Sequence, residues 1–352
     1  MGYRCIPVSD GLLHAAVLGV ALGAASCFFH DTGISLENDP PAIYFAETPW
    51  FVDSTIVRSI NRLDEPVCTL SFNDRNDSIF TMRDTGGASR FVFTQVDTGL
   101  VRKRVAIRYD GTRVGGPFTG AWSIRDEQRA EFVVPYMLTV CYRDSFRLTG
   151  SPAWDLYTAT DTVASAPQLQ YVVPFSGGIQ FNVNAQQNPV FPKRVGLVGR
   201  FGLVGDDSIS VRYLMIGQLG GPGYRIEFFM ARTRNPVLAG EYAGIVLRAN
   251  PIAGNLLALL NVNGQEVDQI TTTRGFISGR MYLMRRGNMV SVKIHPENIP
   301  ASIPVGSTRL NPFVTGDTLY VHLRMSLSAF DSDSARSCNW YDFTVNEGEM
   351  SL

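Results

Sequence analysis

The sequence predicts an all-β protein built from antiparallel sandwiches, and two observations carry this prediction. A period of two places alternate side chains on opposite faces of a strand, so that one face is buried and the other meets solvent. Apolar residues follow this period in several strand-sized runs, most clearly in residues 207–214, 224–230, 281–294 and 319–325. The 33 glycines, 19 prolines and 11% aromatic residues suit short strands joined by turns.

Length and charge narrow the classes of protein. A chain of 352 residues exceeds what one hydrophobic core usually organises, so we expect a smaller and a larger β domain. Charged residues make up 18% of the chain and the net charge is −1. Such a chain presents no large positive field, and we expect no binding to nucleic acid.

Residues 1–27 are typical of an export signal. Arg4 precedes an apolar run over residues 11–25, which suits the core of a signal peptide and is short for a membrane span. The run ends in Ala24-Ala25-Ser26-Cys27, which resembles a bacterial lipobox and predicts lipidation of Cys27. Ala24 and Ser26 also satisfy an ordinary signal peptidase, so simple secretion stays open.

The next segments are predicted to be a tether and a first β domain. Residues 28–42 carry turn formers without periodicity, and residues 43–143 contain short strands separated by turn residues, as in an immunoglobulin-like sandwich. Cys68 and Cys141 both lie within alternating apolar runs of this domain. In an oxidising compartment we expect them to form a disulfide, although two buried thiols are the alternative.

Residues 144–347 contain a series of motifs that resembles one known fold. The series begins with Asp144-Ser145-Phe146 and Trp154, includes a hairpin over residues 279–294 with its turn at Gly287-Asn288, and ends in an aromatic strand over residues 339–345. It is similar to the concanavalin A-like jelly roll of laminin G domains and bacterial glucanases. The resemblance implies a two-layered sandwich whose concave sheet holds carbohydrate.

No catalytic set emerges from the motifs. A glucanase of this fold needs paired carboxylates on one strand, and the nearest match is Glu266-Val267-Asp268, which lacks the third acid of the pattern. The chain contains no G-x-S-x-G elbow and only 4 histidines, which argues against a serine hydrolase. We therefore expect a protein that is not an enzyme, with a glycan-cleaving enzyme kept as an alternative.

Calcium is the one cofactor that the resemblance suggests, because laminin G-like domains often bind it at the rim. The candidate ligands are Asp331 and Asp333, and Asp206 with Asp207 forms a second acidic pair. A polar loop without metal is the alternative for both pairs. No other cofactor is expected.

The strand pattern gathers the candidate ligand-binding residues. If the apolar residues of 319–325 face the core, Tyr320, His322 and Arg324 share the opposite, solvent-facing side. The same reasoning adds Arg225, Glu227 and Arg212. Arginine and aromatic side chains on one sheet suit hydrogen bonding to and stacking on sugars, whereas an ordinary solvated face is the plainer reading.

Together these observations predict an exported cell-envelope protein, lipid-anchored to the membrane or extracellular. Its predicted function is non-catalytic recognition of a polysaccharide or a cell-surface protein through the domain 144–347. Two alternatives to this function stay open: a glycan-cleaving enzyme and a structural subunit of a surface assembly.

Overall fold

The computed structural model describes the chain in segments, and all regular structure in them is β-strand. The described residues are 42–43, 51–52, 55–61, 68–73, 80–86, 90–97, 102–126, 130–146, 154–158, 172–175, 177–183, 194–216, 225–235, 241–249, 256–272, 277–308, 313, 316–326 and 336–351. These segments hold no helix that could span a membrane. The prediction of an all-β chain is confirmed.

The predicted leader and its lipidation site, Cys27, lie outside the described residues. The predicted tether lies outside them too, except for Ala42, which begins the first strand. Both assignments stay predictions. From Pro40 onward the chain forms one compact unit, so the domain boundary expected at residue 144 also stays a prediction.

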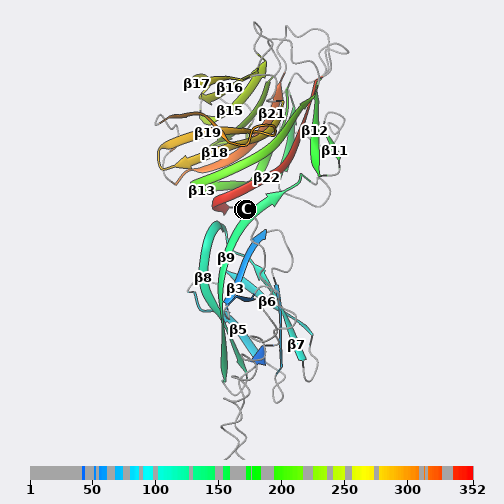
Figure 1. Cartoon of the computed structure of the whole chain (residues 1–352), viewed down its shortest axis with the longest axis vertical. Coiled ribbons are helices and arrows are strands. Elements are labelled where there is room, and N and C mark those ends of the chain that lie inside the picture. The colour runs from blue at the N-terminus through cyan, green and yellow to red at the C-terminus, as the bar shows by residue number, and fades with distance from the viewer. Residues whose placement is uncertain are drawn as a thin grey trace, which may run out of the picture. The chain divides into compact units, whose positions relative to one another are not determined.

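Two sheets form the region before residue 144 (Figure 1). Their strands are β1 (Ala42–Ile43), β2 (Phe51–Val52), β3 (Thr55–Asn61), β4 (Cys68–Asn73), β5 (Phe80–Asp84), β6 (Phe91–Asp97), β7 (Arg102–Tyr109), β8 (Arg113–Asp126) and β9 (Glu131–Asp144). One sheet has the order β1-β4-β7-β6 and the other the order β2-β3-β9-β8-β5, in which β3 and β9 are parallel. This order is compatible with an immunoglobulin-like sandwich, and that assignment stays a prediction.

The following region consists of two layers of antiparallel strands. We call the first layer the front sheet; its order along the sheet is β10 (Trp154–Thr158), β13 (Arg194–Ile216), β21 (Thr318–Ser326), β14 (Arg225–Ala231), β15 (Tyr242–Ala249), β16 (Leu256–Val262) and β17 (Gln265–Thr272). The back sheet has the order β11 (Val172–Phe175), β12 (Gly178–Val183), β22 (Arg336–Ser351), β13, β18 (Ser278–Arg286), β19 (Met289–Pro296) and β20 (Ile303–Thr308).

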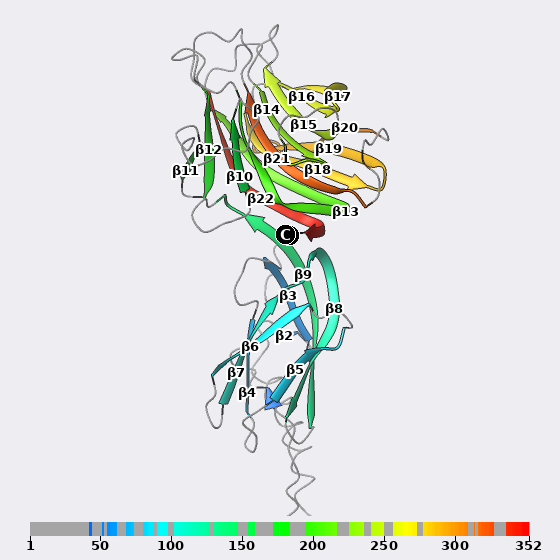
Figure 2. The ribbon, with the colours of Figure 1, turned by 180° about the vertical axis from the view of Figure 1, so that it is seen from behind.

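The long strand β13 belongs to both layers. Its first part, residues 194–204, pairs with β21, and its second part, residues 207–214, pairs with β18. The register with β22 shifts between Val204 and Ser208, where the strand passes from one sheet to the other. One chain segment, β13, therefore joins the two sheets of this jelly roll (Figure 2).

The core lies between the two layers. Ile226, Phe228 and Met230 point inward from β14 and are buried, as are Met281 and Leu283 from β18. β15 contacts β18 and β19, and β16 contacts β20. The alternation that predicted these strands therefore marks the side chains that fill the space between the sheets.

Asp144 explains the motif at the start of this region. Its carboxylate is buried and accepts hydrogen bonds from the backbone N–H of Phe146 (2.7 Å), the indole N–H of Trp154 (2.9 Å) and the hydroxyl of Tyr142 (3.2 Å). Phe146 has a positive φ of 59°, and the aspartate side chain holds the turn in which it lies. The Asp144 carboxylate thus fixes the positions of Tyr142, Phe146 and Trp154 relative to one another.

Cys68 and Cys141 do not form the expected disulfide. On β9 the side chains of Leu138, Val140 and Tyr142 face the core, so Cys141, between the last two, faces away from it. Cys68 is buried on a different sheet. The period of two separates the two sulfur atoms, because one residue points into the core and the other out of it.

Candidate functional site

The outer face of the front sheet, which points away from the core, carries a row of arginines. Strand register places Arg194 of β13 opposite Ser326 of β21, Ser326 opposite Arg225 of β14, and Arg225 opposite Arg248 of β15. We call Arg194, Arg225 and Arg248 the arginine row. Residues that are directly opposite in neighbouring strands share a face, so the three guanidinium groups start from the same side of the sheet.

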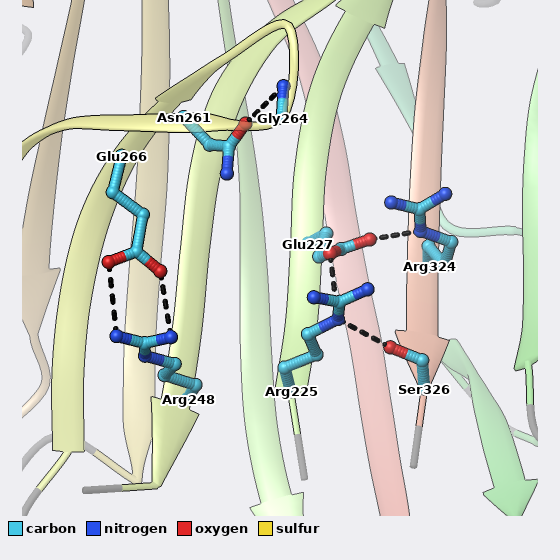
Figure 3. Close-up of polar contacts among 8 residues, drawn as sticks. All are labelled: Arg225, Glu227, Arg248, Asn261, Gly264, Glu266, Arg324 and Ser326. Atoms are coloured by element: carbon cyan, nitrogen blue, oxygen red, sulfur yellow. Dashed lines mark hydrogen bonds and ion pairs between the residues drawn. The ribbon is translucent and has the colours of Figure 1, made fainter. Parts of the chain in front are cut away.

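Glu227 is the centre of a buried ionic cluster beside this row (Figure 3). It forms ion pairs with Arg324, which lies opposite it on β21, and with Arg225, whose Nε is 3.1 Å from Glu227 Oε1. The side chains of Glu227 and Arg324 are only 5% and 6% exposed, whereas that of Arg225 is 45% exposed. Arg225 Nε also donates to Ser326 Oγ at 2.9 Å. Glu227 is therefore a buried anion held by one buried and one accessible guanidinium.

A second ion pair lies nearer the edge of the sheet. Arg248 and Glu266 meet end to end, with Nη1 to Oε1 at 2.7 Å and Nη2 to Oε2 at 3.1 Å (Figure 3). This is the two-point geometry in which a guanidinium recognises a carboxylate. Both side chains are well exposed, at 35% and 40%.

A bulge separates the two acids of the glucanase-like pattern. Leu260 pairs with Asp268, but the register then shifts and Asn261 pairs with Glu266. Because Leu260 and Asn261 are adjacent, their side chains point to opposite faces, and so do the two acids. Asp268 also approaches Gly306 of the back sheet. The two carboxylates therefore do not flank a common site.

Rings of four residues cross the outer face next to the ionic cluster. Tyr242 packs on Phe229 (ring centroids 5.5 Å apart), His322 stacks on Phe229 (4.8 Å), and Tyr157 contacts His322 at 6.2 Å. The rings lie across neighbouring strands at glycines: a Cβ on Gly244 would be 2.3 Å from Phe229 Cβ, and one on Gly196 would be 2.3 Å from the Tyr157 ring. Glycine is required at both positions, because a Cβ would clash with the backbone of the neighbouring strand at Gly244 and with both a backbone oxygen and the Tyr157 ring at Gly196.

His322 is a buried, neutral member of this set. Its Nε2 lies 3.0 Å from the carbonyl oxygen of Thr233, and its Nδ1 has no hydrogen-bond partner within the described segments. Burial lowers the pKa of His322 to about 3, so the ring stays uncharged at neutral pH. A chain segment after β14 thus covers the centre of the ring set, with Arg234 bound to Asp155 of β10.

The structure brings together five of the six residues that the strand pattern selected: Arg225, Glu227, Tyr320, His322 and Arg324 share the outer face of the front sheet. Arg212 is the exception, because it lies in the second part of β13, on the back sheet, where it pairs with Glu297 at 2.7 Å. The expectation of a solvent face is wrong for three of the five. Glu227, His322 and Arg324 are buried.

The candidate calcium ligands Asp331 and Asp333 lie outside the described residues, and a calcium site there stays a prediction. The second acidic pair, Asp206 and Asp207, binds groups of the same chain. Asp206 accepts the Gly287 amide at 2.7 Å, and buried Asp207 lies 3.0 Å from Arg285 Nε. Within the described ranges no three potential ligands cluster for a metal ion.

Arg194, Arg248 and Glu266 were missed as members of this face. Arg248 lies in 242–249, where apolar residues occur on both faces, so alternation does not mark it. The sequence marks Glu266 only as part of the glucanase-like acidic pattern. The register between strands, which a single sequence does not contain, is what joins these residues.

No family model matches the chain, and no curated protein matches it. Solved structures that are similar to the chain do exist. A β-glucanase from Bacillus licheniformis is 8% identical with a TM-score of 0.43, covering 58% of this chain and 97% of its own. Lectin I-B4 from Griffonia simplicifolia, in a metal-free form, is 10% identical with a TM-score of 0.42, covering 61% and 100%. A winged bean acidic lectin with methyl-α-D-galactose is 10% identical with a TM-score of 0.41, covering 60% and 99%.

The strand pairing defines the class of this region as a two-layered antiparallel jelly roll, the fold that the sequence predicts. At these identities and TM-scores, the sugars and reactions of the similar proteins carry no argument for this chain. Its function has to be argued from its own side chains.

Proposed function

We propose that the chain is a non-catalytic binding protein that recognises polysaccharide through the outer face of its front sheet. The observation that carries this proposal is the state of the acids beside the arginine row. Glu227 is buried between two guanidinium groups, and Glu266 is bound end to end by Arg248. Glu227 is therefore shielded from a bound sugar, and among the described residues of this face no second accessible carboxylate lies beside Glu266.

Glycan cleavage would require a different arrangement. Glycosidases use two carboxyl groups that flank the scissile bond, one able to give up a proton and the other to act as base or nucleophile. The bulge in β17 turns Asp268 away from Glu266, and Glu227 has its charge satisfied by arginines. The described part of this face therefore favours binding over hydrolysis.

The chemistry of the face suits a polyhydroxylated ligand. Arg225 supplies N–H donors and Asn261 an amide, while Tyr242 offers a partly buried ring. A small buried apolar cluster, formed by Val246, Leu257 and Leu259, supports these side chains from below. Sugars present hydroxyl edges and apolar C–H faces, and a surface that combines donors with apolar and aromatic groups binds both.

The proposal extends to location. Residues 1–27 have the pattern of an export signal, and Cys27 lies in a sequence similar to a lipobox. We propose a protein that is exported and held at the membrane by a lipid on Cys27, so that residues 43–143 space the binding region from the surface. Mass spectrometry of the protein from the cell envelope tests this, since an unmodified Cys27 would contradict it.

A glycan array with the purified chain tests the binding function. Binding to at least one polysaccharide is expected, with loss on Tyr242→Ala and no loss on Tyr341→Ala, because Tyr341 belongs to the back sheet. A parallel assay measures new reducing ends. Binding to no glycan at millimolar concentration would contradict the proposal, and steady release of reducing ends would favour the glycan-cleaving alternative.

A further inference from the structure

We infer that the ligand is an acidic polysaccharide, whose carboxylate or sulfate groups bind Arg225 and Arg248; this inference rests on the proposed function. Three arginines, Arg225, Arg248 and Arg324, occupy neighbouring positions on the outer face. The described acids among them are Glu227 and Glu266. The positive groups outnumber the negative ones here, although the whole chain has a net charge of −1.

Arg225 has hydrogen-bond donors that the described residues do not use. Its Nε–H is used by Glu227 and Ser326, but within the described segments neither terminal nitrogen has a hydrogen bond or ion pair (Figure 3). A guanidinium carries five N–H donors, four of them on the terminal nitrogens. With the side chain 45% exposed, these four can reach an anion from solvent while Nε keeps the arginine in place.

Glu266 shows how such an anion would bind. It comes from strand β17 at the edge of the front sheet, is 40% exposed, and meets Arg248 in the two-point geometry that guanidinium groups form with carboxylates. An exposed ion pair of this kind contributes little to stability. A ligand carboxylate or sulfate can therefore replace Glu266, which we infer to be an internal competitor for the site.

The spacing of the arginines fits a repeating ligand. Arg225 and Arg248 lie directly opposite on neighbouring strands, which are separated by about 4.8 Å, and Arg194 lies two strands from Arg225 in the other direction. An acidic polysaccharide carries its charges at regular intervals along an extended chain. It can therefore lie across the strands and place two neighbouring charges at Arg225 and Arg248.

Matched polymers and matched variants test this inference. Titration calorimetry of the purified chain compares polygalacturonate with its carboxyl-reduced, neutral form, heparin with its desulfated form, and polyglutamate as an acid that is not a glycan. We expect polygalacturonate to bind more tightly than its neutral, carboxyl-reduced form, and heparin to bind more tightly than its desulfated form, which keeps its carboxylates but carries less charge. Arg225→Gln and Arg248→Gln should each weaken it about tenfold, through loss of a charge-assisted hydrogen bond.

Glu266→Gln gives the sharpest outcome, because a merely structural role would not predict a gain. It should strengthen binding of the acidic glycan about three- to fivefold by removing the competitor. The matched controls are Arg212→Gln and Glu297→Gln, which break an exposed ion pair on the back sheet. They change the net charge of the chain by the same amounts as the arginine and glutamate variants of the front sheet. Neither should change binding. Arg225→Lys keeps the charge next to Glu227 if Arg225→Gln impairs folding.

The outcomes separate the inference from the proposed function. Equal binding of acidic and neutral polymers, or equal effects of the front-sheet and back-sheet variants, would overturn the inference while leaving polysaccharide recognition intact. Equal binding of polyglutamate would show that charge alone is recognised and would also overturn it. Binding of none of the glycans would contradict the proposed function itself.

Discussion

Replacing Arg324 by methionine should destabilise the front sheet strongly. Methionine fills a volume similar to that of the arginine stem but leaves Glu227 without its buried partner. Breaking one half of a buried ion pair typically costs about 3–5 kcal/mol, because a charge then remains in a medium of low polarity. Arg225 still lies 3.1 Å from Glu227, but it is 45% exposed and its attraction is screened. We therefore expect a loss near the lower limit, about 3 kcal/mol.

Equilibrium urea unfolding measures this loss, and a double variant isolates its cause. Glu227→Met combined with Arg324→Met removes both charges and should recover most of the stability, to within about 1 kcal/mol of the parent, since an apolar pair of similar size can replace a buried ion pair. A loss below about 1 kcal/mol for Arg324→Met alone would refute the reasoning. It would mean that water or a protonated Glu227 relieves the charge.

Three further predictions concern the rest of the chain. Asp144→Ala should lower the free energy of unfolding, measured by urea denaturation, by about 3 kcal/mol, because the indole N–H of Trp154 and the backbone N–H of Phe146 lose their acceptor. Asp144→Asn keeps an acceptor oxygen and should lower the free energy of unfolding less. Burial raises the pKa of Asp207 from 3.8 to about 7, outweighing the nearby guanidinium groups. The folded chain then holds a proton that the unfolded chain releases between these values, so its contribution to stability is full below about pH 4 and is lost as pH rises through about 7. The melting temperature should fall over this range, and a parallel fall in Asp207→Asn would contradict that origin. Mass spectrometry under non-reducing conditions should find no bridge between Cys68 and Cys141, and a linked peptide would contradict the side-chain directions in β9.

Local patterns were enough to predict the strands and part of the site. The alternation in 319–325 placed Tyr320, His322 and Arg324 on one face, and that in 224–230 placed Arg225 and Glu227 together. These inferences succeeded because side-chain direction in a strand depends on the period of two alone. The motif of Asp144, Phe146 and Trp154 likewise contains the acceptor and two of its three hydrogen-bond donors.

Other features depend on residues far apart in the sequence and were not predictable. Arg212 was grouped with the wrong sheet because β13 passes from one layer to the other within a single strand. The burial of His322 follows from a contact with Thr233, which lies 89 residues away in the sequence. The separation of Glu266 and Asp268 results from a bulge that leaves no mark in the residue pattern.

The place of β22 in the back sheet has a consequence for how the jelly roll assembles. β22 is the last of the described strands along the chain, yet it lies between β12 and β13, near the middle of its sheet. During synthesis its partners β12 and β13 are made first, and the backbone groups that later pair with β22 stay unpaired until it is made. We expect the two layers to close cooperatively only once residues 336–351 are available, so that removing this short segment would leave a sheet split at its centre rather than one trimmed at its border.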